Sequence, residues 1–188
     1  MSWIREIDEE EATEELKAVY DRIKRNRGKV ANIMKVHSLN PKSMLAHQDL
    51  YLNLMFSRSG LSREEREMMG VLISGLNGCE YCRLHHAEAL NHYWKNEAKT
   101  NEFMEDFRSI MLGDRGRAML EYAEKLTKDP ESIGKGDVDS LIAAGFNDED
   151  VLNINLIASY FNFVNRIALG LGVEYTAEET RGYKNDVQ

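Results

Sequence analysis

The sequence predicts an all-α fold, and three observations lead to that prediction. Apolar residues recur at the three- and four-residue spacing of an amphipathic helix over most of the chain. Proline is nearly absent, since Pro41 and Pro130 are the two examples among 188 residues. No segment alternates apolar and polar residues long enough to form a strand. A chain of this length suits one core, and we expect a single domain spanning residues 1–188.

The expected helices follow one another closely along the chain. Their apolar positions place them near residues 12–23, 41–56, 62–77, 79–94, 103–111, 118–126, 138–142, 148–160 and 162–170. A loop is expected at Pro130 and around residues 134–136, where glycine is frequent.

Three short patterns fix helix ends more sharply than the apolar spacing does. Asn40-Pro41 is typical of a helix start, with an N-cap followed by proline at the first helical position. Ser62 followed three residues later by Glu65 has the pattern of a capping box. Asn77-Gly78 predicts a helix end, because both residue types tolerate the left-handed backbone of a C-terminal cap.

The charge pattern excludes some classes of partner. The net charge is −8, and no cluster of lysine or arginine offers a face for a phosphate backbone, so we expect no nucleic-acid binding. The acid-rich residues 1–15 lack the apolar segment of a signal peptide. Residues 156–171 are apolar but contain Asn162, Asn165 and Arg166, which a membrane span would not normally carry. We therefore expect a cytoplasmic protein without a membrane segment.

Two parts of the chain resemble each other at a shift of 85 positions. Residues 61–86 align with residues 146–171, so that Ser62 falls on Asn147 and Asn77 falls on Asn162. The pattern suggests a duplicated helix pair. The copy at about 62–95 carries the chemically reactive side chains, and the copy at about 147–171 has lost them. A chance resemblance is the alternative. In the second copy, the counterparts of the chemically interesting residues are all apolar: Leu152, Val164, Ile167 and Leu171.

The candidate chemistry gathers on one stripe of one helix. At ~100° per residue, Cys79, Cys82 and His86 fall within roughly 60° of one another. Cys79 is expected at the helix start, where free N–H groups and the helix dipole favour a thiolate. A Cys-x-x-Cys pair at that position can close to a disulfide, so one sulfur can attack a peroxide and the other can resolve the sulfenic acid.

Glu67 is the candidate proton partner of this stripe. Antiparallel packing across the Asn77-Gly78 turn would bring it over the cysteines and His86, where a carboxylate orients the imidazole or takes a thiol proton. The alternative is a solvated position, because Glu67 belongs to the charged run of residues 63–67.

Other interpretations of the cysteine pair remain open. The two thiols fit inert core packing, or a zinc site made by Cys79, Cys82 and His86 with Glu67 or water as the fourth ligand. A structural zinc site usually has a second pair of ligands, and the sequence offers none at suitable spacing. We expect no metal and no cofactor. His37, His47 and His92 show no partner pattern and receive no role.

The stretch from Glu67 to His86 resembles the alkylhydroperoxidase D-like branch of the carboxymuconolactone decarboxylase superfamily. The pattern of that branch is a glutamate, eleven intervening residues and then Cys-x-x-Cys-x-x-x-His, and Glu67, Cys79, Cys82 and His86 match each position. The sequence around the cysteines looks closest to the peroxidase-related subfamily. The resemblance extends to Asn40-Pro41, to Leu61-Ser62 and to residues 162–170, and so covers most of the chain.

The resemblance implies an all-helical homo-oligomer, commonly a trimer or hexamer, which reduces hydroperoxides with electrons from a thiol or dithiol. It implies that Cys82 attacks the peroxide, that Cys79 resolves, and that Glu67 and His86 relay protons. The helix dipole instead favours Cys79 as the more acidic thiol, so the two arguments disagree on roles. Tyr81 stands where well-studied members have a second histidine, which puts the ionisation of Cys82 in doubt.

We therefore expect a thiol-dependent peroxidase. One alternative is an enzyme that decarboxylates or handles lactones, as the superfamily's name implies; such chemistry needs an acid–base site but no cysteine pair. Another is a non-enzymatic thiol redox sensor or zinc-binding protein.

Overall fold

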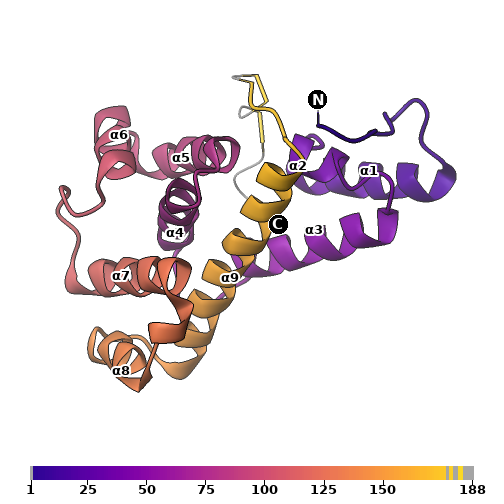
Figure 1. The fold of residues 1–188 in the computed structure, drawn as a ribbon. Coiled ribbons are helices and arrows are strands. Elements are labelled where there is room, and N and C mark those ends of the chain that lie inside the picture. The colour runs from indigo at the N-terminus through magenta and orange to yellow at the C-terminus, as the bar shows by residue number, and fades with distance from the viewer. Residues whose placement is uncertain (1, 177, 180–181, 184–188) are drawn as a thin grey trace. The chain divides into compact units, whose positions relative to one another are not determined.

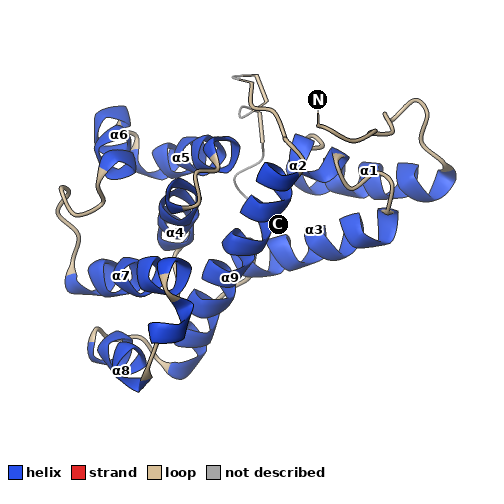
Figure 2. Cartoon of the chain, in the orientation of Figure 1, coloured by secondary structure: helices blue, strands red, loops and turns tan. Residues whose placement is uncertain are grey.

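A computed structural model describes residues 2–176, 178–179, 182 and 183. Within these residues every regular element is a helix, as the sequence predicts. Figures 1 and 2 show the helices in chain order. No helix in the described part of the chain is both long and apolar enough to cross a membrane.

The chain forms two compact units, one of residues 1–56 with 166–188 and one of residues 57–165. The first contains α1 (Glu14–Arg27), α2 (Asn32–Lys35) and α3 (Pro41–Phe56). Its core is an apolar cluster drawn mainly from α1 and the segment after it: Leu16, Val19, Tyr20, Ile23, Val30, Met34 and Met44.

The second unit carries the candidate site. Its helices are α4 (Arg63–Leu76), α5 (Glu80–Trp94), α6 (Glu97–Glu105), α7 (Asp114–Lys128), the 3₁₀ turn η1 (Pro130–Ser132), α8 (Lys135–Ala143) and the greater part of α9 (Asp148–Gly170). Helix α4 packs against both α5 and α7, and α5 packs against α6. Because α4 contacts both neighbours, most of its side chains are buried, including residues 66–71.

The predicted caps are confirmed. The Asn40 side chain accepts the N–H of Ser43 at 3.1 Å, so α3 begins where expected. The Ser62 and Glu65 side chains each accept the other's backbone N–H, at 3.1 and 2.7 Å, which completes the capping box of α4.

The Asn77-Gly78 turn ends α4 with a Schellman motif. Gly78 has φ +70°, a conformation that costs glycine little because it has no Cβ. Its N–H donates to the Gly75 carbonyl at 3.1 Å, and the Cys79 N–H donates to the Ser74 carbonyl at 2.9 Å. Cys79 is therefore the last residue of this motif and, at the same time, the N-cap of α5.

The helix expected at residues 103–111 is wrong from Asp106 onward. Helix α6 ends at Glu105, and the Asp106 side chain accepts the Arg108 N–H at 3.0 Å, which turns the chain away from helical geometry. Phe107 and Ile110 are still buried, but in a loop, so their helical spacing reflects burial alone. Met111 is fully exposed.

The two helices expected at residues 148–160 and 162–170 are also wrong, because α9 is continuous from Asp148 to Gly170. The Asn162 side chain donates to the Ala158 carbonyl at 3.0 Å within the helix, and no glycine follows it. At the aligned position Asn77, Gly78 supplies the left-handed turn that breaks the helix. The second segment is thus one helix rather than a pair, and a duplication remains a hypothesis about the sequence.

Candidate redox site

Glu67 is buried and belongs to an ion-pair network. Its side chain has no exposed surface, which excludes the solvated position that its charged neighbours suggested. Its Oε2 lies 2.6 Å from Nδ1 of His86 on α5, and its Oε1 pairs with the guanidinium of Arg63, one turn earlier on α4. Each oxygen of the carboxylate therefore faces a different nitrogen partner.

Gly70 explains how α5 approaches α4 closely enough for that contact. A Cβ at this position would lie 2.8 Å from Cγ of His86 and 2.9 Å from Cζ of Phe161. The rings of His86 and Phe161 meet edge to face with centroids 4.6 Å apart. The imidazole is thus fixed on one side by Phe161 of α9, on another by the bare backbone of Gly70, and at Nδ1 by Glu67.

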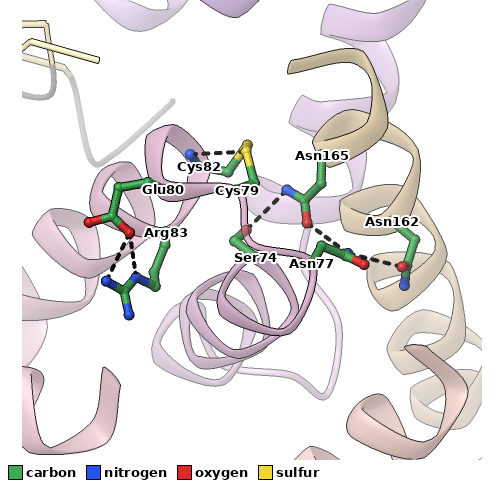
Figure 3. The surroundings of a disulfide bond; sticks show 8 residues. All are labelled: Ser74, Asn77, Cys79, Glu80, Cys82, Arg83, Asn162 and Asn165. Atoms are coloured by element: carbon green, nitrogen blue, oxygen red, sulfur yellow. Dashed lines mark hydrogen bonds and ion pairs between the residues drawn. A yellow bond between two sulfur atoms is a disulfide. The ribbon is translucent and has the colours of Figure 1, made fainter. Parts of the chain in front are cut away.

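The two cysteines form a disulfide at the start of α5, with Cα atoms 5.4 Å apart (Figure 3). Sγ of Cys79 also accepts the N–H of Cys82 at 3.4 Å, as an N-cap side chain does. Cys79 is 1% exposed and Cys82 is 4% exposed, so the disulfide is nearly enclosed. Glu80 and Arg83 pair with each other away from it (Figure 3).

Helix geometry places Cys82 nearer than Cys79 to the imidazole. Cys82 and His86 are four residues apart on α5, or about 6 Å of rise, and share one face. Cys79 precedes His86 by seven residues, which is about 10.5 Å of rise at the same 1.5 Å per residue. Because Nδ1 of His86 faces Glu67, Nε2 is the ring nitrogen left to exchange a proton with Cys82.

The structure thus brings Glu67 and His86 into contact and joins Cys79 to Cys82, two of the contacts that the motif predicts. Arg63 contacts the carboxylate of Glu67, and Gly70 and Phe161 contact the imidazole of His86. The sequence did not predict these three contacts. Only Gly70 had a local signal, a glycine inside a strong helical pattern.

His85, His37 and His47 make contacts other than the Glu67–His86 pair. The ring centroids of His85 and Tyr81 lie 4.5 Å apart. In the other unit, Nε2 of His37 lies 3.1 Å from Nδ1 of His47, a pair that the sequence did not indicate. In the described residues, no three side chains of His, Cys, Asp or Glu are grouped to hold a metal ion.

Comparison with known proteins identifies the family. The model of the carboxymuconolactone decarboxylase family matches residues 41–125, which include the whole Glu67–His86 stretch. A peroxidase-related protein from Silicibacter sp. TM1040 is 30% identical over 89% of this chain and 88% of its own, with a TM-score of 0.82. The chain belongs to the carboxymuconolactone decarboxylase family.

Other solved structures are also similar to this chain. A peroxidase-related protein with an alkylhydroperoxidase AhpD core, from Ralstonia eutropha JMP134, is 26% identical over 97% of this chain and 98% of its own, with a TM-score of 0.86. The debrominase Bmp8 is 20% identical over 96% of this chain and 97% of its own; its TM-score of 0.74 shows a shared fold. No curated protein is similar enough to count as a match. The predicted AhpD-like, all-helical fold is confirmed.

Proposed function

We propose that this protein is a thiol-dependent peroxidase that reduces hydroperoxides through Cys79 and Cys82, with His86 and Glu67 moving the protons. The observation that carries the proposal is the Glu67–His86 contact of 2.6 Å, one helical turn from a cysteine pair that forms a disulfide. A disulfide between residues at the start of a helix is the product expected after one peroxide has been reduced.

In the first step, the thiolate of Cys82 attacks the outer oxygen of the hydroperoxide. The O–O bond breaks, its electron pair leaves with the alkoxide, and His86 gives that oxygen the proton it took from the thiol. The products are an alcohol and a sulfenic acid on Cys82. The position of Cys82, about 6 Å of helix rise from His86, supports it as the attacking sulfur.

In the second step, the thiolate of Cys79 attacks Sγ of Cys82. The S–O bond breaks, the hydroxide takes a proton and leaves as water, and the disulfide forms. The free N–H groups of the first turn of α5 stabilise the Cys79 thiolate that this step needs. The same effect would also favour Cys79 as the attacking thiol, so the assignment of roles rests on the nearness of Cys82 to His86. A thiol or dithiol reductant then supplies two electrons and returns both cysteines to the reduced state.

Turnover of cumene hydroperoxide with dithiothreitol tests the proposal. The wild type is expected to turn over, Cys82→Ser to lose the reaction, and Cys79→Ser to turn over more slowly, because dithiothreitol must then reduce the sulfenic acid of Cys82 directly. His86→Gln is expected to slow the reaction about 100-fold, the usual contribution of a general acid–base group. His92→Gln, at an exposed site near the end of the same helix, is the matched control and is expected to behave as wild type.

The competing interpretations predict other outcomes. If wild type and both cysteine variants consume peroxide equally slowly, the peroxidase assignment fails. A decarboxylase or lactone-handling enzyme would keep its activity on its own substrate in the cysteine variants. A redox sensor would show disulfide exchange without peroxide turnover.

A further inference from the structure

Side chains of the turn before Cys79 are hydrogen-bonded to side chains of α9 (Figure 3). Nδ2 of Asn165 donates to Oγ of Ser74 at 3.1 Å, and Oδ1 of Asn165 accepts from Nδ2 of Asn77 at 2.9 Å. Neither Asn165 nor Ser74 has any exposed surface. Both Nδ2 and Oδ1 of Asn165 therefore form hydrogen bonds in a position that water does not reach. Loss of either bond would leave a buried polar group unsatisfied and destabilise the fold.

The residues that Asn165 contacts are the ones that form the turn before Cys79. Ser74 gives its carbonyl to the Cys79 N–H, and Asn77 is the C-cap residue of α4. Asn165 therefore holds the side chains of two residues of the same Schellman motif, and Cys79 is that motif's last residue. The contact reaches across 91 positions of sequence, from α9 to the end of α4.

The chain of bonds continues beyond Asn165. Nδ2 of Asn77 also lies 3.0 Å from Oδ1 of Asn162, whose own Nδ2 donates to Thr127 on α7 at 3.0 Å. Hydrogen bonds thus connect the turn to α9, and α9 to α7. They are made by the side-chain amides of Asn77, Asn162 and Asn165. Two of these, Asn77 and Asn162, are the asparagines that the 85-residue shift aligns, and here they contact each other.

We propose that Asn165 is a positioning residue that sets the redox equilibrium of the Cys79–Cys82 pair by holding the Ser74–Cys79 turn in place. The inference rests on the proposed function for its biological meaning, but the quantity it concerns is the thiol–disulfide equilibrium alone. A turn fixed in both redox states keeps Cys79 beside Cys82 after reduction, which raises the effective concentration of one thiol at the other. A loosened turn lets Cys79 move away, so the disulfide becomes easier to reduce.

The test is the equilibrium of the purified full-length protein with defined ratios of reduced and oxidised glutathione. Asn165→Ala is expected to lower the equilibrium constant for disulfide formation about tenfold, which is about 30 mV for a two-electron couple. Ser74→Ala, a milder change that removes only the hydroxyl, is expected to shift it in the same direction and by less. The measurement needs no peroxide.

Asn155→Ala is the matched control. Asn155 lies on α9 and donates to the hydroxyl of Tyr122 on α7 at 2.9 Å, so the variant removes an α9 amide bond that does not involve the turn. It is expected to lower thermal stability and to leave the glutathione equilibrium unchanged. If Asn165→Ala and Ser74→Ala also lose stability while keeping the wild-type equilibrium constant, Asn165 is merely structural and the inference is wrong.

The two proposals fail in different ways. A wild type that equilibrates normally with glutathione but does not turn over peroxide overturns the proposed function and leaves the positioning role standing. A wild type that turns over peroxide while Asn165→Ala keeps its equilibrium constant overturns the positioning role alone. If Asn165→Ala does not fold, Ser74→Ala decides the question by the same measurement.

Discussion

Nδ1 of His86 lies 2.6 Å from Oε2 of Glu67, across the interface between α5 and α4. The contact joins two residues 19 positions apart and depends on the tight turn between their helices. It fixes which nitrogen of His86 is turned toward the carboxylate and which is left for chemistry.

Glu67→Gln is expected to slow the reaction of the reduced protein with hydroperoxide by about 100-fold near neutral pH, because the imidazole loses the charge that orients it. The amide keeps the shape of the side chain, so the fold is expected to persist. The measurement is the second-order rate constant of thiol oxidation as a function of pH. Glu88→Gln, an exposed position on α5, is the control; an unchanged profile in Glu67→Gln would remove Glu67 from the proton relay.

Gly70→Ala is expected to lower both activity and stability. The new Cβ would lie 2.8 Å from the His86 ring and 2.9 Å from that of Phe161, so one ring must move. Overpacking of this kind typically costs about 1–3 kcal/mol, and a displaced imidazole no longer meets Glu67. Urea unfolding and peroxide turnover measure the two effects.

Gly116→Ala is the matched control for this substitution. Gly116 lies inside α7, and the nearest atoms to its Cβ position are at 3.8 Å, an ordinary contact. Alanine in a helix is expected to stabilise the protein by about 0.5–1 kcal/mol there. If both glycine variants behave alike, the close approach of His86 to α4 does not matter for the site.

Arg63→Met is expected to destabilise the protein by about 3 kcal/mol, since it leaves the buried carboxylate of Glu67 without its guanidinium partner. The two side chains are 14% and 0% exposed. Arg117→Met breaks an i,i+4 Arg–Glu pair of the same spacing on the surface of α7, where the side chains are 38% and 51% exposed. That control is expected to cost at most about 0.5 kcal/mol.

A double-mutant cycle separates the ion pair from other effects of Arg63. When Glu67→Gln is already present, Arg63→Met should cost about 1–3 kcal/mol less than it does alone. Equal costs in both backgrounds would show that Arg63 acts through packing rather than through the carboxylate.

Acid is expected to destabilise the unit that contains His47. Burial lowers the pKa of His47 to about 3, with the charge of His37 as a second cause. Below pH 6.5 the unfolded chain gains a proton at His47 that the folded chain does not. The contribution of neutral His47 to the free energy of unfolding is therefore largest above pH 6.5 and decreases as the pH falls toward 3. The loss is about 2 kcal/mol between pH 6.5 and 5.

Urea unfolding at several pH values checks this slope. His47→Gln is expected to flatten it, whereas His92→Gln, at an exposed position, should retain it. A slope that His47→Gln leaves unchanged would mean that other groups account for the acid sensitivity.

Local patterns in the sequence predicted the ends of several helices and the candidate residues. The caps at Asn40, Ser62 and Asn77 depend on neighbours within five positions, and they are found as expected. The same holds for the stripe on α5, whose order follows from helix geometry alone.

Contacts between distant segments could not be predicted. The burial of Glu67 depends on how α4 packs, and nothing in the charged run of residues 63–67 distinguishes it from an exposed neighbour. The role of Asn165 requires knowing that α9 meets the end of α4. The sequence pattern indicates helix in the loop after Glu105, because Phe107 and Ile110 are buried at a spacing that a helix would also produce.

In the proposed function, Cys79 and Cys82 reduce a hydroperoxide with the help of Glu67 and His86. The most direct measurement adds one equivalent of cumene hydroperoxide to fully reduced protein and follows free thiols, alcohol and the protein mass. Two thiols are expected to disappear per alcohol formed, and the mass is expected to fall by that of two hydrogens, as one Cys79–Cys82 disulfide forms. Thiols that persist beside unreacted peroxide would contradict it.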